Sequence, residues 1–587
     1  MPGIYGVANS RNPKENIENI ENMAKTMFLY NHFVQDEHFH DAKISASRSH
    51  TGQVGSKTSP VCLDNYMLWV EGEAYNVNDV ALELNSNAQT LADLLLVAEQ
   101  GGQLNKALNQ LDGYFCAALY NVEQKKVKLI SDRYGMRLLY WYHENGVFAW
   151  GSEVKAILAV EGVDKNLDST SFDCFMDLGY LMGEHTWFEH IKLIKPATVI
   201  EYDMLADKSH QYHYWKWSEI KPSNLSFDEA VDELGERFIE AVSRRFDPNK
   251  RIGISLSGGL DSRAIFAAVD HLYPDYEGYA FTFGIPGCSD ITIAERVIAL
   301  SSWQHEKFHF SADNWFEPRI EKVWNTDGML DMMHMHGSEF ASEISENIDL
   351  NLNGYLGDAV FGGSYLTKLN RVNTRVDESI AESYYLEHAE GYDDDFYSIN
   401  HFDSYLYMVR GRRFINYGTA NLLPWIGQIK PFFDNKVIEL AFSLPDEYRV
   451  GNHLYAFMLQ KFFPKYFRDI PWQQTGKPAG EIKKASVAIL AARKGVRVLK
   501  QMAGIQSTKG YTDYPAWIRD EAVAAKLKEL LNYETARYRL LTKDDLAQRW
   551  LQPHLSSKLV NNSNQILRIA TLEIYLRKVF GEKSSDS

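Results

Sequence analysis

A glycine turn between a short apolar run and a helical pattern constrains this chain more than any other segment. Residues 252–256 are mostly apolar and predict a buried strand, and a helical pattern follows from Asp261. The turn between them reads Ser257-Gly258-Gly259. A strand that passes through glycines into a helix presents free backbone N–H groups and the positive end of the helix dipole to an anion. The sequence therefore predicts an α/β fold with an anion-binding turn.

The side chains of this turn indicate that the anion is a phosphate held together with a metal ion. Gly258 and Gly259 allow the backbone to approach a ligand closely, and Ser257 and Ser262 can add hydroxyl donors. Asp261 would repel a phosphate directly, but it is a suitable ligand for a Mg²⁺ ion that bridges to phosphate oxygens. The turn lacks the Gly-x4-Gly-Lys-Ser/Thr spacing of the Walker loop, so we expect a phosphate loop of another type.

Length and composition exclude several classes of protein. With 587 residues the chain is too long for one ordinary core, and two or more domains are expected. A net charge of −17 argues against a nucleic-acid or acidic-membrane partner. The sequence has no apolar run of membrane-spanning length and no signal-peptide pattern, and its 4 cysteines lack paired metal-ligand spacing. We therefore expect a cytoplasmic protein with buried free thiols.

The character of the sequence changes near residue 205. Residues 1–205 contain short apolar runs between Gly, Asn and Asp turns and predict a strand-rich domain, with strands over 66–70, 115–120, 127–130 and 147–150. A polar connector is expected over 206–225. Residues 226–587 predict an α/β segment followed by a helix-rich part, which opens with a capping box at Ser226 and Glu229 and closes with a helix over about 564–579.

Short motifs occur in both halves in a characteristic order. They are Met1-Pro-Gly-Ile-Tyr-Gly6, Glu71-Gly-Glu-Ala-Tyr-Asn76, Leu111-Asp-Gly-Tyr-Phe115, Ser131-Asp-Arg-Tyr-Gly135, Gly151-Ser-Glu-Val-Lys-Ala156, the turn at 256–262, Phe281-Thr-Phe-Gly284, Gly357-Asp-Ala-Val-Phe-Gly-Gly363 and Leu444-Pro-Asp-Glu447. Together they resemble the asparagine synthetase superfamily. The resemblance implies an Ntn-type αββα sandwich related to class II glutamine amidotransferases over 1–205. It implies a pyrophosphate-loop, adenine nucleotide α-hydrolase-like α/β domain with a helical C-terminal part over 226–587.

Two departures from the family pattern affect the first domain. Family members that hydrolyse glutamine carry a cysteine after the initiator methionine, whereas this chain has Pro2, which has no thiol nucleophile. The family's Asn-Gly-Glu oxyanion segment is Glu71-Gly72-Glu73 here, which places a carboxylate where negative charge has to be stabilised. We therefore expect this domain to be an inactive, glutaminase-like relic.

The resemblance also assigns a nucleotide site with ATP and Mg²⁺ as cofactors. It implies that Asp261 and Asp358 hold Mg²⁺ on the ATP phosphates, a role for which hard carboxylate oxygens are suited. Leu256 and Phe283 are expected to line the adenine slot, and Gly354 is expected near the ribose or the α-phosphate. The turn residues Ser257, Gly258, Gly259 and Ser262 complete the predicted nucleotide-binding set.

Candidate catalytic residues follow from the same comparison. Tyr355 occupies the position at which asparagine synthetases have a glutamate, and it resembles β-lactam and carbapenam synthetases, in which a Tyr–Glu pair deprotonates an internal amine. The alternative role of Tyr355 is an aromatic wall beside adenine or substrate. Glu382 and Glu387 are the candidate partner acids, on a helix that is expected to expose most of its carboxylates. Lys477, in the loop over 469–478, is the candidate for the family's catalytic lysine; the alternative is a solvent-facing loop lysine.

The implied reaction joins a carboxylate to an amine. Mg·ATP and the carboxylate give an acyl-adenylate and pyrophosphate, and an amine then gives an amide and AMP. A macrolactam synthetase of the lasso-peptide cyclase type, a small-ring closer like β-lactam synthetase and an ammonia-using asparagine synthetase remain open, as does a non-catalytic relative. The chain length, the relic domain and the Met-Pro-Gly-Ile start favour the first. Its substrate would be a small-molecule or peptide carboxylate and amine, and its partners would be a precursor peptide and a leader-processing protease.

Overall fold

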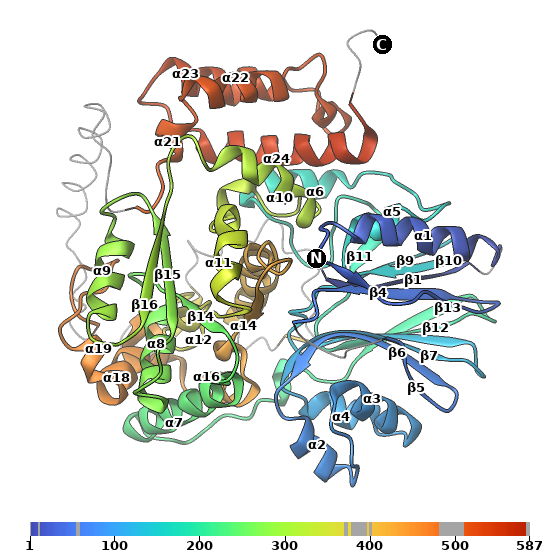
Figure 1. The fold of residues 1–587 in the computed structure, drawn as a ribbon, viewed down its shortest axis with the longest axis horizontal. Coiled ribbons are helices and arrows are strands. Elements are labelled where there is room, and N and C mark those ends of the chain that lie inside the picture. Colours follow the sequence, from blue (N-terminus) through green and yellow to red (C-terminus); the bar gives the residue numbers. More distant parts are fainter. Residues whose placement is uncertain are drawn as a thin grey trace. The chain divides into compact units, whose positions relative to one another are not determined.

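The computed structural model describes residues 2–9, 12–53, 59–368, 374–376, 396–397, 402–479 and 510–582. They belong to two compact units (Figure 1). The first unit comprises Met1–Cys174, Tyr180–Lys221 and Ala381–Gly427, and the second comprises Phe175–Gly179, Pro222–Ile380 and Gln428–Ser587.

The first unit is an αββα sandwich, which confirms the predicted fold class. A 7-stranded sheet has the order β11-β9-β10-β1-β4-β2, with β3 also on β4, and a 6-stranded sheet has the order β13-β12-β8-β7-β6-β5. Helices α1 (Glu15–Met27) and α5 (Val154–Leu158) cover the first sheet, and α3 (Leu91–Gln100) packs on the second (Figure 1). The apolar core between the sheets includes Ile4, Trp150, Trp69 and Leu129. The strands are β1 (Gly3–Asn9), β2 (Val34–Gln35), β3 (Phe39–His40), β4 (Ser45–His50), β5 (Val61–Leu63), β6 (Tyr66–Ala74), β7 (Gly113–Asn121), β8 (Lys126–Ser131), β9 (Tyr140–Glu144), β10 (Val147–Gly151), β11 (Ile191–Leu193), β12 (Thr198–Asp203) and β13 (Lys208–His213).

Two features of the first unit differ from the boundaries expected at 205 and 225. Strand β13 lies inside the expected connector and pairs antiparallel with β12. It is a polar edge strand whose residues are exposed or half-buried, so its sequence resembles a connector. The described part of Ala381–Gly427 also belongs to this unit. There, the buried Arg412 donates to the carbonyl oxygen of Gly135 (3.0 Å) and the buried Arg413 donates to that of Leu181 (3.0 Å).

The second unit is built on a mainly parallel sheet with the order β16-β15-β14-β17-β20. Its strands are β14 (Ile252–Ser255), β15 (Tyr279–Gly284), β16 (Gln304–His309), β17 (Leu350–Leu352) and β20 (Gly427–Ile429). Strand β14 pairs in parallel with both β15 and β17, so that Ile254 lies between Ala280 and Leu352. The carboxyl ends of these three strands therefore meet at one edge of the sheet, the edge at which open α/β folds bind ligands.

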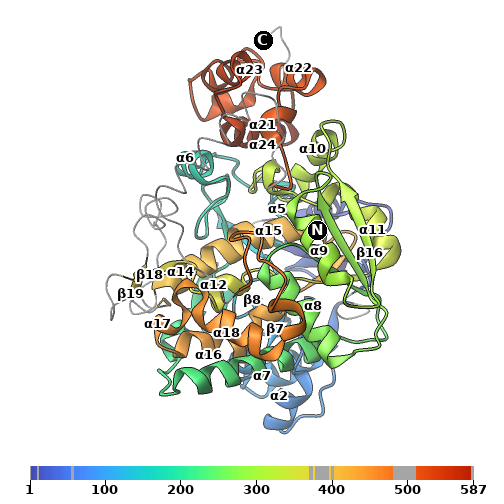
Figure 2. The same ribbon diagram turned by 90° about the vertical axis from the view of Figure 1, so that its left-hand side faces the viewer.

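Helices surround this sheet and form the C-terminal part, as the sequence predicted. Helix α8 (Leu260–Leu272) follows β14, and α9 (Ser289–Ile298) follows β15. At the C-terminus, α22 (Glu521–Leu530) and α24 (Ser563–Phe580) lie side by side (Figures 1 and 2). Within the described ranges, no helix is both long enough and apolar enough to cross a membrane.

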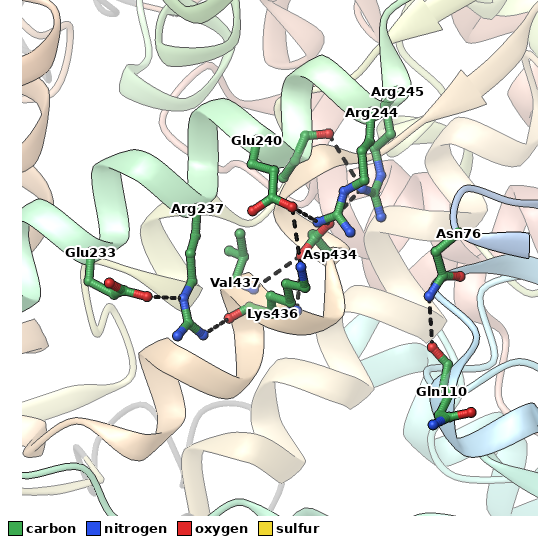
Figure 3. Close-up of polar contacts among 11 residues, drawn as sticks. Asn76, Gln110, Glu233, Arg237, Glu240, Arg244, Arg245, Asp434, Lys436 and Val437 are labelled. Atoms are coloured by element: carbon green, nitrogen blue, oxygen red, sulfur yellow. Dashed lines mark hydrogen bonds and ion pairs between the residues drawn. The ribbon is translucent and has the colours of Figure 1, made fainter. Parts of the chain in front are cut away.

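Helix α7 (Phe227–Arg245) is fixed at both ends. Its start has the predicted capping box, in which the Ser226 N–H donates to the Glu229 carboxylate at 2.8 Å. Near its end, Arg244 and Arg245 each lie 2.7 Å from Oδ2 of Asp434, the N-cap residue of α16 (Asn435–Ser443) (Figure 3). Because the Asp434 carboxylate also accepts from the backbone of α16, the buried charge is fully engaged, and this network holds α7 against α16.

Candidate functional site

The turn after β14 is closed by hydrogen bonds among its own residues and to Asp290 on α9. The Ser257 N–H donates to Oγ of Ser262 at 3.0 Å, and the Gly259 N–H donates to Oγ of Ser257 at 3.2 Å. The Gly258 N–H donates to Oδ1 of Asp290 at 2.9 Å. Strand β14 ends here and α8 begins with Gly259 as its N-cap residue, so the turn has the strand-to-helix geometry that the sequence predicted. In contrast to the expectation of free donors, the N–H groups of Ser257, Gly258 and Gly259 are all engaged within the protein.

Asp261 and Asp358, the two aspartates expected to hold Mg²⁺, are in contact with each other beside this turn. Oδ2 of Asp261 accepts from the backbone N–H of Asp358 at 3.1 Å, and Oδ1 accepts from the Tyr455 hydroxyl at 3.0 Å. Burial and the neighbouring charge of Asp358 raise the pKa of Asp261 well above its usual value. A divalent cation would replace this repulsion by attraction, and carboxylate oxygens are the ligands that Mg²⁺ prefers. The donor set therefore fits Mg²⁺.

Two glycines allow the aspartates to approach each other. A Cβ atom on Gly354 would lie 2.5 Å from the backbone nitrogen of Ser262 and 2.8 Å from the carbonyl carbon of Asp261. A Cβ atom on Gly357, the first residue of α12 (Gly357–Val360), would lie 2.8 Å from Cγ of Asp261. The segment after β17 therefore packs directly on the start of α8, and Gly354 lies against the predicted phosphate turn. Its contact with the ribose or the α-phosphate stays a prediction.

The residues expected to line an adenine slot occupy two environments. Leu256 is buried, and its N–H donates to the carbonyl oxygen of Phe281 at 2.9 Å. Phe283 is half-buried near the carboxyl end of β15, with its ring 5.9 Å from that of Phe310 and directly against Gly337. Both lie on strands that reach the edge at which the turn is found, but contact with adenine stays a prediction.

The loop that carries Lys477 is attached to the glycine turn by the buried Arg263. Its Nη2 donates to the carbonyl oxygens of Gly258 (3.1 Å) and Pro471 (3.0 Å), and its Nη1 donates to that of Ile470 (3.1 Å). Burial lowers the pKa of Arg263 to about 10.

Further along the same loop, Gln473 completes the attachment. Its N–H donates to the Gly258 carbonyl oxygen at 3.2 Å, and its side chain donates to Oδ2 of Asp290 at 2.6 Å. Lys477 is exposed, directly after Gly476 with its left-handed φ of 71°. The loop is thus fixed beside the turn, while the Lys477 side chain extends from it.

Of the three residues predicted to form the base, Tyr355 is the one among the described residues. Tyr355 lies between β17 and Asp358, and its N–H donates to Oδ1 of Asn353 at 3.0 Å. Desolvation raises the pKa of its hydroxyl, although the residue is 40% exposed. Glu382 and Glu387 lie outside the described residues.

Three residues that shape the site, Asp290, Tyr455 and Arg263, were not predicted from the sequence. Asp290, which binds the turn, follows the Phe281–Gly284 motif along the chain, and its position after a predicted strand could have placed it at the same sheet edge. Tyr455 binds Asp261 from 194 residues away, and Arg263 acts through main-chain carbonyls, so neither has a local signal.

The two departures from the family pattern in the first unit, Pro2 and Glu71, are both buried. Pro2 is buried at the start of β1, and burial raises the pKa of Glu71, whose carboxylate lies 3.8 Å from Arg137. One cysteine lies close to β1 in space: Sγ of Cys116 is 3.8 Å from Oγ of Ser152, which accepts from the backbone N–H of Ile4. Burial raises the pKa of the Cys116 thiol to about 12, so it is not a thiolate nucleophile at neutral pH.

Known proteins match both halves of the chain. Residues 1–215 match the glutamine amidotransferase domain, and residues 233–410 match asparagine synthase. A putative glutamine-hydrolysing asparagine synthetase 2 from Methanocaldococcus jannaschii is 24% identical over 51% of this chain and 59% of its own length. Glutamine-hydrolysing asparagine synthetases 1 and 3 from Bacillus subtilis are 22% and 24% identical, over 62% and 68% of this chain and 59% and 72% of their own lengths. The chain thus spans less than two thirds of the first two of these relatives.

Proposed function

The chain belongs to the asparagine synthetase superfamily, and on that premise we propose that it is an ATP-dependent, AMP-forming ligase that joins a carboxylate to an amine. We further propose that it does so without glutamine hydrolysis and that its product is a macrolactam formed within a peptide. The observation that carries the ligase proposal is the Asp261–Asp358 pair at the glycine turn.

The residues around the turn supply what adenylation needs. In this step a carboxylate oxygen bonds to the α-phosphorus, and the bond between the α-phosphorus and the bridging oxygen breaks to release pyrophosphate. Mg²⁺ held by Asp261 and Asp358 would offset the charge of the phosphate oxygens. The N-terminus of α8 favours the same negative charge. Lys477, on the loop tied to Gly258, would stabilise the departing pyrophosphate.

Amide formation follows from attack on the adenylate. The amine nitrogen bonds to the acyl carbon, AMP leaves with the acyl oxygen, and the nitrogen loses a proton. Tyr355, three residues before Asp358 in the chain, is the proposed base for this proton transfer, with Glu382 or Glu387 as its partner. A base held in the site suits an amine that is already part of the substrate.

Three features of the first unit support an amine source other than glutamine. Pro2 offers no thiol, Glu71 places a buried carboxyl in the oxyanion segment, and the Cys116 thiol has a raised pKa. Because the proposed amine is then part of a peptide substrate, the proposed partners are a precursor peptide and a protease that removes its leader.

Isotope exchange between labelled pyrophosphate and ATP tests the proposal. We expect exchange that depends on Mg²⁺ and on a peptide with a free N-terminal amine and an internal Asp or Glu, and mass spectrometry should show loss of one water from that peptide. Conversion of aspartate and ammonia to asparagine, or ring closure of a small amino acid alone, would overturn the macrolactam assignment and retain the ligase. Absence of exchange with all these substrates would overturn the ligase itself.

A further inference from the structure

A partly buried polar cluster lies beside the carboxyl edge of the sheet, outside the set of residues proposed for the reaction. The Tyr511 hydroxyl lies 2.8 Å from Nε2 of His336, and the Tyr514 hydroxyl lies 3.2 Å from Nδ1 of the same ring. Arg319 donates from Nη1 to the Tyr514 oxygen at 2.6 Å and pairs through Nε with Glu339. Two tyrosines, a histidine and an ion pair thus form one chain of hydrogen bonds.

The hydrogen bonds of Tyr514 determine the proton positions in this series of side chains. The Tyr514 hydroxyl donates to the carbonyl oxygen of Met333 at 2.9 Å, so its oxygen can only accept from its other partners. Nδ1 of His336 must therefore carry a proton and donate to Tyr514. Burial and the charge of Arg319 lower the pKa of His336 well below its usual value, so the ring is neutral and its Nε2 is bare. The Tyr511 hydroxyl has to donate to that nitrogen.

Tyr511 can offer a ligand only a hydrogen-bond acceptor. A hydroxyl group has one proton and two lone pairs, and the proton of Tyr511 is already given to His336. Towards its other side, the oxygen is therefore an acceptor only. It is a poor proton relay, because a second proton on the buried His336 is disfavoured by the neighbouring Arg319.

Tyr511 lies close to the proposed nucleotide turn. Its carbonyl oxygen accepts from the N–H of Ile285, directly after β15, at 3.0 Å. A Cβ atom on Gly284 would lie 3.2 Å from Cβ of Tyr511, so the residue packs on the end of that strand. Strand β15 pairs in parallel with β14, so the end of β15 on which Tyr511 packs lies at the same edge of the sheet as the glycine turn. Tyr511 itself is only half-buried.

We propose that Tyr511 positions the attacking amine by accepting a hydrogen bond from its N–H, and that His336 and Tyr514 hold Tyr511 in this acceptor state. The inference rests on the proposed ligase function and adds a residue to it. An acceptor fixed in this way directs one N–H bond of a neutral amine towards itself and so leaves the nitrogen lone pair to point at the acyl carbon. A ribose hydroxyl of ATP is the other donor with the same chemistry, and the two sources affect different half-reactions.

Tyr511→Phe, which removes only the hydroxyl, tests the inference in the full-length protein. We expect pyrophosphate exchange and the KM for ATP within about twofold of the wild type, and amide formation about tenfold slower, the value of one hydrogen bond. With a substrate that lacks its own amine and with hydroxylamine as the acceptor, the KM for hydroxylamine should rise. Tyr279→Phe is the matched control, because its hydroxyl binds the exposed Glu306 at the other end of the same strand.

The outcomes separate the two proposals. Wild-type amide formation by Tyr511→Phe would overturn this inference and leave the ligase proposal intact, whereas a raised KM for ATP would assign Tyr511 to the ribose and overturn the amine role. Absence of exchange in the wild type would overturn both. Should Tyr511→Phe fold poorly, His336→Phe gives a second reading: it frees the Tyr511 proton, and we expect slower amide formation with exchange retained.

Discussion

Arg263 attaches the Lys477 loop to the glycine turn, and its hydrogen bonds allow us to calculate how much free energy a substitution there would cost. Arg263 is fully buried, and its guanidinium reaches four main-chain carbonyl oxygens, those of Gly258, Tyr466, Ile470 and Pro471. Arg263→Lys keeps the length and the formal charge but loses the planar fork of donors.

The magnitude follows from the donors that are lost. A lysine ammonium at this point can reach about two of the four carbonyls, and hydrogen bonds from charged groups contribute about 1.5 kcal/mol each at the low end, so the loss is about 3 kcal/mol. Burial already lowers the pKa of Arg263 to about 10. The same burial acts on a lysine from a lower starting pKa of about 10.4, which favours its neutral form and weakens the remaining bonds.

We expect this loss in two measurements. Amide hydrogen exchange should quicken in the peptide over 466–479, where the Gln473 N–H now donates to Gly258, and pyrophosphate exchange should fall about 100-fold if the full 3 kcal/mol is spent on positioning the loop. Arg296→Lys is the matched control, because that exposed arginine makes one bond, of 3.2 Å, to the Asp469 carbonyl oxygen of the same loop, and its replacement should change little. Unchanged exchange protection in Arg263→Lys would refute the reasoning, because the loop would then be held by other contacts.

Three further predictions concern the metal pair, the acid stability and the first unit. Asp261→Asn and Asp358→Asn should each abolish pyrophosphate exchange yet raise the unfolding temperature without ligand, measured by calorimetry at pH 7, because each removes the repulsion that raises the pKa of Asp261; lower unfolding temperatures would contradict this. Burial lowers the pKa of His554 to about 4, so the unfolded chain binds a proton between pH 6.5 and 4 that the folded chain does not. The free energy of unfolding should therefore fall by about 3 kcal/mol when the pH is lowered from 6.5 to 4. Denaturant unfolding of His554→Asn over the same pH range should show a smaller fall, and an equal fall would exclude His554 as the cause. Glutamine should release no ammonia in a coupled assay, with wild type or with Pro2→Cys, since Glu71 still occupies the oxyanion segment; ammonia from either would contradict the relic assignment.

The parts of the fold that could be predicted from the sequence are those with a signal inside about ten residues. The capping box at Ser226, the strand before Ser257 and the apolar runs that became β7 and β10 are confirmed by the structure. In each case the pattern of apolar side chains or a capping side chain acts within the element itself, so local sequence is sufficient.

The parts that could not be predicted depend on packing between distant segments. Strand β13 has a polar, partly exposed pattern because it is an edge strand, and no periodicity separates such a strand from a connector. Arg412 and Arg413 join their segment to the first unit through main-chain carbonyls, which any sequence could offer. Tyr455 binds Asp261 only because α18 (His453–Phe462) places it there.

The aspartate pair shows how sequence constraints and packing combine at one point. Parallel pairing of β14 with β17 brings the residues after both strands to one edge, and the absence of side chains at Gly354 and Gly357 permits the close approach. The result is an electrostatically unfavourable arrangement in the absence of a cation, since burial and Asp358 both oppose ionisation of Asp261. A ligand that brings a divalent cation relieves this opposition, so we expect Mg·ATP to raise the free energy of unfolding as its concentration exceeds its Kd. The destabilised pair and the proposed affinity for a metal–nucleotide complex are therefore two consequences of the same packing.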